Sequence, residues 1–72
     1  DLAKSQEDKA MANPIFRVLA EQRLAAAGFG PGGIDGRFDD NTREAIFQYQ
    51  QANDLPATGY LDVNSINRLL ND

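Results

Sequence analysis

The sequence predicts an all-α fold, a small bundle of three helices joined by two long glycine-rich turns. The first observation behind this prediction is that three segments, residues 14–27, 40–52 and 63–70, carry apolar residues at the spacing of an amphipathic helix. The second is that glycine and proline gather in the two stretches between these segments, where they mark turns. The three apolar faces are expected to share one core.

The first thirteen residues do not belong to this pattern. They are polar, and their main apolar residues, Leu2, Ala10 and Met11, show only weak periodicity. Terminal segments of this kind are commonly poorly ordered. We therefore expect residues 1–13 to be a linker or the frayed tail of an upstream domain. A short helix docked on the rest of the chain is the alternative, and the domain itself is predicted to span residues 14–72.

The first predicted helix runs from Pro14 to Ala27. Asn13 before it can cap the free amides, and proline fits the first helical position. Gly28 ends the helix, because glycine takes the left-handed conformation without a steric penalty. Helical spacing gives two apolar faces. They consist of Phe16, Ala20, Leu24 and Ala27 on one side and of Ile15, Val18, Leu19 and Ala26 on the other. The second face predicts a further contact, with the N-terminal segment or a neighbouring domain.

The first long turn leads into the second predicted helix. Two of its apolar residues, Ile34 and Phe38, are expected to anchor the turn in the core. Asp39 is the predicted N-cap of the helix at 40–52, and Asn53 can adopt the left-handed conformation that ends it. The inward face of this helix is predicted to consist of Thr42, Ala45, Ile46, Tyr49 and Ala52.

The second long turn again carries apolar anchors, followed by the last predicted helix. Leu55 and Leu61 are the anchors, and Asp62 is the predicted cap of a helix over residues 63–70. The inward residues of this helix are predicted to be Val63, Ile66, Leu69 and Leu70. The two turn-to-helix units are only loosely alike, so we predict no true repeat.

Composition excludes several classes of function. The 72 residues carry a net charge of −4, which disfavours nucleic acid, whose phosphates are neutralised by Lys and Arg, and anionic membranes. The chain has neither cysteine nor histidine, so a Ser-His-Asp or Cys-His nucleophile is excluded. The spacing of a calcium loop is missing too. No apolar run approaches the roughly 20 residues that span a bilayer. We expect no catalytic residue, no metal, no cofactor and no membrane insertion of this fragment.

One set of positions carries a pattern that resembles a known family. These positions are Leu24 and Gly28, then Asp35-Gly36-Arg37-Phe38-Asp39, then Thr42, Ala45, Tyr49-Gln50, Asp54-Leu55, Gly59, Asp62, Ser65 and Leu69. The pattern resembles the peptidoglycan-binding-like module, a small three-helix domain found beside bacterial cell-wall enzymes. The resemblance implies a noncatalytic module that binds peptidoglycan and targets a larger protein, in the periplasm or the extracellular cell envelope of a bacterium. Because the chain begins at Asp1 and not at a methionine, we expect a fragment or processed product with a covalently linked upstream domain.

The chain departs from the family pattern at three places. The Leu-Gln pair of the family's first helix is Ala20-Glu21 here, and two glycines of the turns are replaced by Asp39 and Asp54. Aspartate tolerates the unusual backbone angles of turns, so these two changes are conservative for the fold. The change in the first helix concerns the binding groove.

The resemblance implies a shallow groove along the edge between the turns and the helices. The candidate ligand-binding residues are Phe29, Asp35, Arg37, Asn41, Thr42, Gln50 and Tyr60. Phe29 and Tyr60 lie in the two turns, where their rings either pack in the core or close one groove and stack on sugar rings. Arg37 either holds a carboxylate of a stem peptide in a bidentate pair or is a solvated loop charge.

The polar candidates are open to two interpretations as well. Gln50 either contacts the ligand or bonds the loop backbone from a buried position. Asn41, Thr42 and Asn53 either donate to N-acetyl groups or are ordinary residues of a helix end. Asp35 has a role in the turn, because its side chain can bond the backbone two residues on.

A second class of function stays open beside wall binding. Phe47 lies opposite the core face of its helix and is expected to be exposed, so it is either incidental or marks a contact with a partner protein. A protein-interaction or spacer domain of the same fold would use Phe47 or the second face of the first helix.

Overall fold

Four helices make up the fold, and no strand occurs in residues 2–30 and 32–71, the part of the chain that the structure describes. In this computed structural model α1 spans Leu2–Ala10, α2 spans Pro14–Ala26, α3 spans Asp40–Ala52 and α4 spans Val63–Asn71. The all-α prediction is confirmed. The predicted number of three helices is corrected to four, because the polar N-terminal segment contributes α1.

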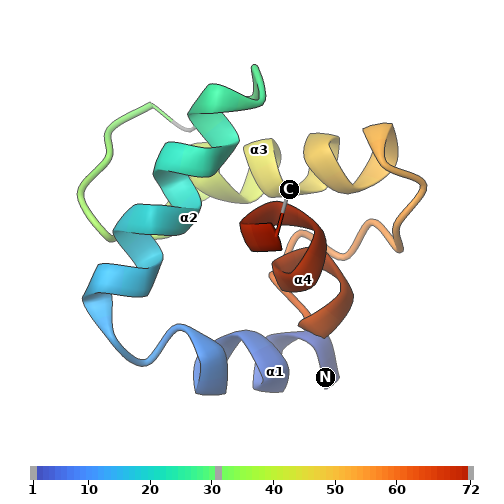
Figure 1. Ribbon diagram of the computed structural model, residues 1–72, viewed down its shortest axis with the longest axis horizontal. Coiled ribbons are helices and arrows are strands. Elements are labelled where there is room, and N and C mark those ends of the chain that lie inside the picture. Colours follow the sequence, from blue (N-terminus) through green and yellow to red (C-terminus); the bar gives the residue numbers. More distant parts are fainter. Residues whose placement is uncertain (1, 31, 72) are drawn as a thin grey trace.

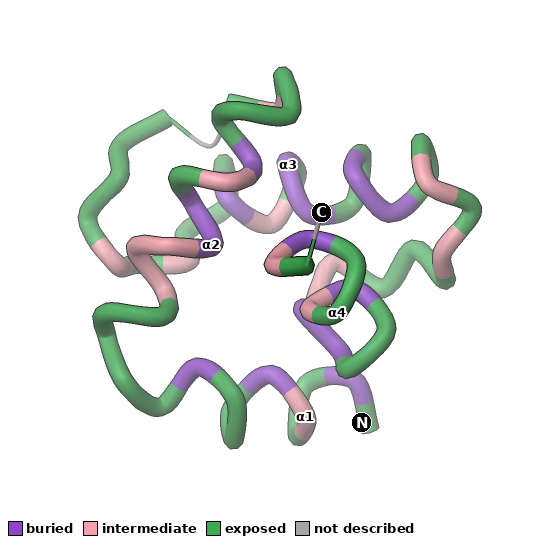
Figure 2. Tube along the Cα trace, viewed as in Figure 1, coloured by how far each residue is buried: buried purple, intermediate pink, exposed green. Residues whose placement is uncertain are grey.

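The helices surround a single core. α2 packs against α3 and α4, and α4 also packs against α1; α4 lies in the middle of the arrangement, with α1 along one edge (Figure 1). Buried residues of all four helices face this interior (Figure 2). The core cluster consists of Met11, Ala20, Leu24, Ala45, Ile46, Tyr49, Leu61 and Leu69.

α1 packs on the rest of the chain. Ala3 and Glu7 are buried along it, and Met11 just after it belongs to the core cluster. Arg17 Nε of α2 donates to the Met11 carbonyl oxygen at 2.7 Å. The docked helix, which is the predicted alternative to a linker, is therefore present. Apolar periodicity did not reveal it, because one of the two residues that α1 buries is a glutamate.

The ends of α2 form as predicted from local sequence. Asn13 Oδ1 accepts from the Ile15 amide at 3.0 Å. Gly28, two residues after the helix, has a φ of +93°. The Phe29 amide then donates to the Leu24 carbonyl oxygen at 2.9 Å, as in the Schellman motif that satisfies carbonyl groups at a helix end. The helix stops one residue earlier than predicted.

The inward face of α2 is turned relative to the prediction. Ala20 and Leu24 are fully buried, and so is Glu21, whereas Phe16 and Ala27 are exposed. Burial of Glu21 rotates the inward direction of the helix toward this residue and away from Phe16. The apolar pattern assigned Phe16 to the core because it took no account of a buried carboxylate.

α3 begins and ends where the sequence predicts. Asp39 Oδ1 caps it by accepting from the Thr42 amide at 3.0 Å. The buried residues of the predicted inward face are Thr42, Ala45, Ile46 and Tyr49. Ala52 is exposed instead. The left-handed residue after the helix is Asp54, with a φ of +57°, and not Asn53, whose φ is −107°. Aspartate tolerates this conformation better than most residues.

α4 is capped by Asp62, whose Oδ1 accepts from the Ser65 amide at 2.9 Å. Leu69 is buried in the core cluster, whereas Val63 is exposed, contrary to the prediction. Val63 is the first residue of the helix, and its backbone amide, not its side chain, makes the contact with α1: it donates to Gln6 Oε1 at 3.0 Å.

Three of the four predicted loop anchors reach the core. Phe38 and Leu55 pack against the core cluster, and Leu61 belongs to it. Ile34 is exposed, which corrects its prediction as an anchor. It precedes the turn at Gly36, where the loop is fastened to α2.

Candidate functional site

Two stretches with the same order of residues lead into α3 and α4. They are residues 36–42 and 59–65, and both read Gly-x-Phe/Leu-Asp-x-Asn-Thr/Ser. Both glycines have a positive φ, of +81° at Gly36 and +79° at Gly59, and both aspartates cap the helix that follows. The prediction that the two units are only loosely alike is thereby corrected. We call these stretches the repeated turns.

A buried side chain of the preceding helix holds each repeated turn. Glu21 of α2 accepts from the Gly36 amide through Oε1 at 2.7 Å. Gln50 of α3 accepts from the Gly59 amide through Oε1 at 2.9 Å and donates from Nε2 to the Tyr60 carbonyl oxygen at 2.7 Å. Gln50 thus bonds the loop backbone, one of its two predicted roles. Glu21 and Gln50 together set the position of the surface that the turns present.

The first repeated turn also carries a perturbed carboxylate. The hydrogen bond from the Thr42 backbone amide is the main cause that holds the pKa of Asp39 below its ordinary value of 3.8. The Thr42 hydroxyl lies 3.2 Å from Asp39 Oδ1 and 3.2 Å from Glu21 Oε2. Thr42 therefore links the cap of α3 to the carboxylate that holds the turn.

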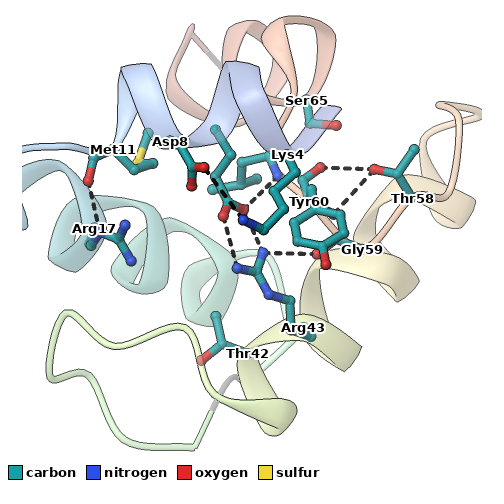
Figure 3. A network of polar contacts seen from close by, with 12 residues as sticks. Lys4, Asp8, Met11, Arg17, Thr42, Arg43, Thr58, Gly59, Tyr60 and Ser65 are labelled. Atoms are coloured by element: carbon teal, nitrogen blue, oxygen red, sulfur yellow. Dashed lines mark hydrogen bonds and ion pairs between the residues drawn. The ribbon is translucent and has the colours of Figure 1, made fainter. Parts of the chain in front are cut away.

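Arg43 of α3 connects α1 with the second repeated turn (Figure 3), and its guanidinium also contacts the Phe38 ring of the first. Its guanidinium donates to both carboxylate oxygens of Glu7, with 2.8 Å between Nη2 and Oε2, and Nη1 donates to the Gly59 carbonyl oxygen at 3.2 Å. The guanidinium carbon lies 4.4 Å from the centroid of the Tyr60 ring and 5.5 Å from that of the Phe38 ring. Both distances are in the range of cation–π contacts.

A groove of about 380 Å³ opens where α2 and α3 end, beside α4. It is lined by Arg23, Ala26, Ala27, Phe29, Tyr49, Asn53 and Leu69; we call it the Phe29 groove. The Phe29 and Tyr49 rings meet edge to face, with centroids 5.8 Å apart. The Asn53 side chain donates to the Tyr49 carbonyl oxygen at 2.9 Å and accepts from Arg68 Nε at 3.3 Å. Apolar walls with a few positioned polar groups are typical of ligand sites.

The two turn aromatics lie against different faces of α3. Phe29 contacts Tyr49, and Tyr60 contacts Arg43. Tyr49 and Arg43 are six residues apart on this helix, which corresponds to about 240° around its axis and about 9 Å along it. The structure therefore does not bring the two rings together as the walls of one groove.

The remaining predicted site residues divide into an exposed and a buried group. Asp35, Arg37 and Asn41 are exposed, and Asp35 Oδ1 accepts from the Arg37 amide at 2.9 Å, the predicted turn contact. Thr42 and Gln50 are fully buried. Because their polar atoms bond within the chain, a ligand on the surface of this structure reaches neither side chain.

Sequence reasoning did not single out Arg23, Glu7 and Arg43 as site residues. Asn53 was predicted as a possible donor to N-acetyl groups, and it lines the Phe29 groove. Glu7 and Arg43 are 36 positions apart and lie in different helices, so no local pattern connects them. The sequence does contain one relevant signal, the common residue order of the repeated turns. It identifies the two turns that both contact Arg43.

The outer face of α2 carries a second groove of about 380 Å³, lined by Pro14, Ile15, Val18, Leu19 and Gln22. Ile15 is 72% exposed, in agreement with the second apolar face that the sequence predicts for this helix. Phe47 on α3 is 36% exposed, also as predicted.

Within residues 2–30 and 32–71, no three acidic side chains are grouped so that they could hold a metal ion. None of the helices described there combines the length and the apolar character that crossing a membrane requires.

The comparisons with known proteins give one result. A family model described as “Putative peptidoglycan binding domain” matches residues 16–69 of the 72-residue chain. No curated protein and no solved structure matches the chain. The matched residues include the repeated turns, their two buried anchors and the Phe29 groove, whereas α1 precedes them. The chain belongs to this family of peptidoglycan binding domains.

Proposed function

We propose that this chain is a noncatalytic module that binds peptidoglycan and holds a larger bacterial envelope protein at the cell wall. The observation that carries the proposal is the family match over residues 16–69. The module would act in the periplasm or at the extracellular cell envelope, and any catalysis would belong to the covalently linked remainder of the protein.

The Phe29 groove is the surface that best fits a wall fragment. It combines an aromatic ring, on which the apolar face of a sugar can stack, with the Arg23 guanidinium and the Asn53 amide at its lining. An arginine suits a ligand that carries carboxylates, because its fork matches their geometry. This local positive charge matters in a chain with a net charge of −4.

A groove this shallow gives weak binding. With one or two rings for stacking and one arginine, we expect a Kd of about 0.1–1 mM for soluble fragments, or roughly −4 to −5.5 kcal/mol. Retention on intact sacculi would then depend on rebinding along the wall or on a second module of the same protein.

The test compares the substitution of two arginines, one inside the Phe29 groove and one outside it. Arg23 lines the Phe29 groove, and Arg37 lies exposed in the long loop. We expect Arg23→Ala to weaken co-sedimentation with purified sacculi severalfold and Arg37→Ala to weaken it less. Chitin and an unrelated acidic protein serve as controls, and thermal melts verify that both variants fold.

The outcomes separate the function from its location. No enrichment of the unaltered chain on sacculi contradicts wall binding itself. Enrichment that depends on Arg37 and not on Arg23 keeps the function and moves the ligand to the long loop. Enrichment that neither variant reduces excludes both arginines as ligand contacts.

A protein-interaction or spacer domain is the second candidate function. It is favoured by the apolar groove on the outer face of α2, whose lining includes the exposed Ile15. Ile15→Ser should then reduce association with the linked or partner protein and leave sacculus binding unchanged. The reverse result would favour wall binding alone.

A further inference from the structure

The Glu7 carboxylate occupies a site that other elements build. Arg43 donates to both of its oxygens, and the Leu61 amide donates to Oε1 at 2.9 Å. These donors come from α3 and from the second repeated turn. Glu7 itself is 1% exposed, so its carboxylate is held almost entirely by protein groups.

The site around Arg43 is preorganised by the turns. The Phe38 and Tyr60 rings both lie against the guanidinium, and the Gly59 carbonyl oxygen accepts from Nη1. A bidentate arginine and a backbone amide that converge on one point are the donors that a carboxylate requires. The arrangement therefore has the chemistry of a carboxylate-binding site, independently of which carboxylate fills it.

The donor groups and the Glu7 carboxylate that they bind belong to different parts of the chain. Arg43, Phe38, Tyr60 and Leu61 all lie within residues 16–69, which match the family, whereas Glu7 lies outside this range. α1 has nine residues, and isolated helices shorter than about 12–15 residues are marginal in water. Its position depends on docking contacts, and the Glu7–Arg43 pair among them is both charged and bidentate.

We infer that Arg43, together with the Leu61 amide and the flanking rings, is a carboxylate-binding site, and that α1 fills it with Glu7 in competition with carboxylates of the wall. The inference rests on the proposed peptidoglycan binding only for the identity of the competing ligand, a stem-peptide carboxylate. α1 would then act as a strap that limits access to this second site. The site differs from the Phe29 groove, which lies against another face of α3.

The first experiment tests the site without peptidoglycan. Glu7→Ala in the full chain removes the atoms that acetate contains, a methyl carbon and a carboxylate. We expect sodium acetate to raise the melting temperature of Glu7→Ala in a saturable way, and sodium chloride at equal ionic strength to raise it less. Acetamide, which has the same shape without the charge, should give no saturable rise. If Glu7→Ala is unfolded alone, recovery of helical circular dichroism with acetate is the equivalent result.

The second experiment tests the competition. Glu7→Gln keeps the shape of the side chain and removes its charge, so it should compete less well, and retention on sacculi should rise severalfold. Asp8→Asn is the matched control, since it makes the same change in charge at an exposed position of α1 that pairs with Lys4 at 3.6 Å. It should leave retention unchanged.

The outcomes decide the inference separately from the proposed function. No specific effect of acetate on Glu7→Ala overturns the carboxylate site, whatever the sacculi show. An effect of acetate without higher retention of a folded Glu7→Gln overturns the competition, because Glu7 is then a permanent structural ligand. If the unaltered chain and Glu7→Gln both fail to bind sacculi, the proposed function and the competition fail together, while the acetate titration still decides the site.

Discussion

Gly36 occupies a position where the backbone conformation disfavours a side chain. Its φ is +81°, and a Cβ there would lie 3.4 Å from Val18 Cγ2 and 3.7 Å from the Pro14 carbonyl oxygen. Its amide is also the donor to Glu21. A single residue thus combines a left-handed conformation, close packing on α2 and the hydrogen bond that fastens the long loop.

Replacement of Gly36 by valine should lower the free energy of unfolding by more than about 1 kcal/mol, because a β-branched residue is strained at positive φ. Gly33→Val is the matched control, since a Cβ at Gly33 meets nothing within 4 Å and its φ lies outside the left-handed range. Urea unfolding of the two variants provides the measurement. Equal stability of both would contradict the turn described here.

The depressed pKa of Asp39 predicts a loss of stability in acid. A carboxyl group whose pKa is lower in the folded state stabilises the fold above its unfolded pKa, and this contribution is lost as pH falls through the folded pKa. The decline should therefore begin near the ordinary value of 3.8 and continue below it. Asp39→Ser keeps a capping oxygen without the charge.

The measurement is the melting temperature of each protein between pH 5 and pH 2, expressed as the change from its own value at pH 5. The melting temperature of Asp39→Ser should fall less steeply across this window than that of the unaltered chain. Parallel curves would show that protonation of other carboxyl groups accounts for the whole acid response.

At the scale of the element, two adjacent residues of α3 lie in different surroundings. Ile46 is fully buried, and Phe47 beside it is 36% exposed. We expect Ile46→Ala to cost about 2–4 kcal/mol, as core truncations do. Phe47→Ser should change the free energy of unfolding by no more than about 0.5 kcal/mol, as other surface substitutions do. Chemical denaturation of the pair gives the comparison, and a large cost at Phe47 would remove it as a candidate partner contact.

α1 shows how an element can escape detection by periodicity. Its inward contacts are Ala3, the Glu7 carboxylate and the adjacent Met11, so the apolar stripe that marks an amphipathic helix is interrupted by a charge. The partner that makes this charge acceptable, Arg43, is 36 positions away. The prediction of a linker followed from polarity, whereas the docked helix follows from a contact that polarity does not encode.

For the whole molecule, this contact extends the folding unit toward the N-terminus. A chain that begins at Asn13 would lose Met11 from the core and leave Arg43 without Glu7. Loss of one large buried side chain costs about 2–5 kcal/mol, and small domains have only about 5–15 kcal/mol in total. We therefore expect the shortened chain to melt far below the full one in circular dichroism. Leu2→Ala, at an exposed position of α1, should melt unchanged, and equal melting of the shortened chain would contradict the role of α1.

The features that depend on near neighbours can be predicted from the sequence. The bounds of α2, α3 and α4 were predicted to within one residue, as were their caps at Asn13, Asp39 and Asp62. The positive φ at Gly28 followed in the same way. Capping bonds and turn conformations involve residues within a few positions of each other, so their cause is present in the local sequence. The family also followed from a motif whose spacing these turns preserve.

The pairing of distant surfaces depends on the complete fold. The Glu7 carboxylate bonds partners 36 and 54 positions away, and the inward direction of α2 turns toward Glu21 because this carboxylate bonds the Gly36 amide 15 positions on. The same packing directs Phe29 to Tyr49 and Tyr60 to Arg43, on separate faces of α3. Such pairings minimise the cost of burying charged and polar groups, and this cost depends on the partners that the whole fold brings together.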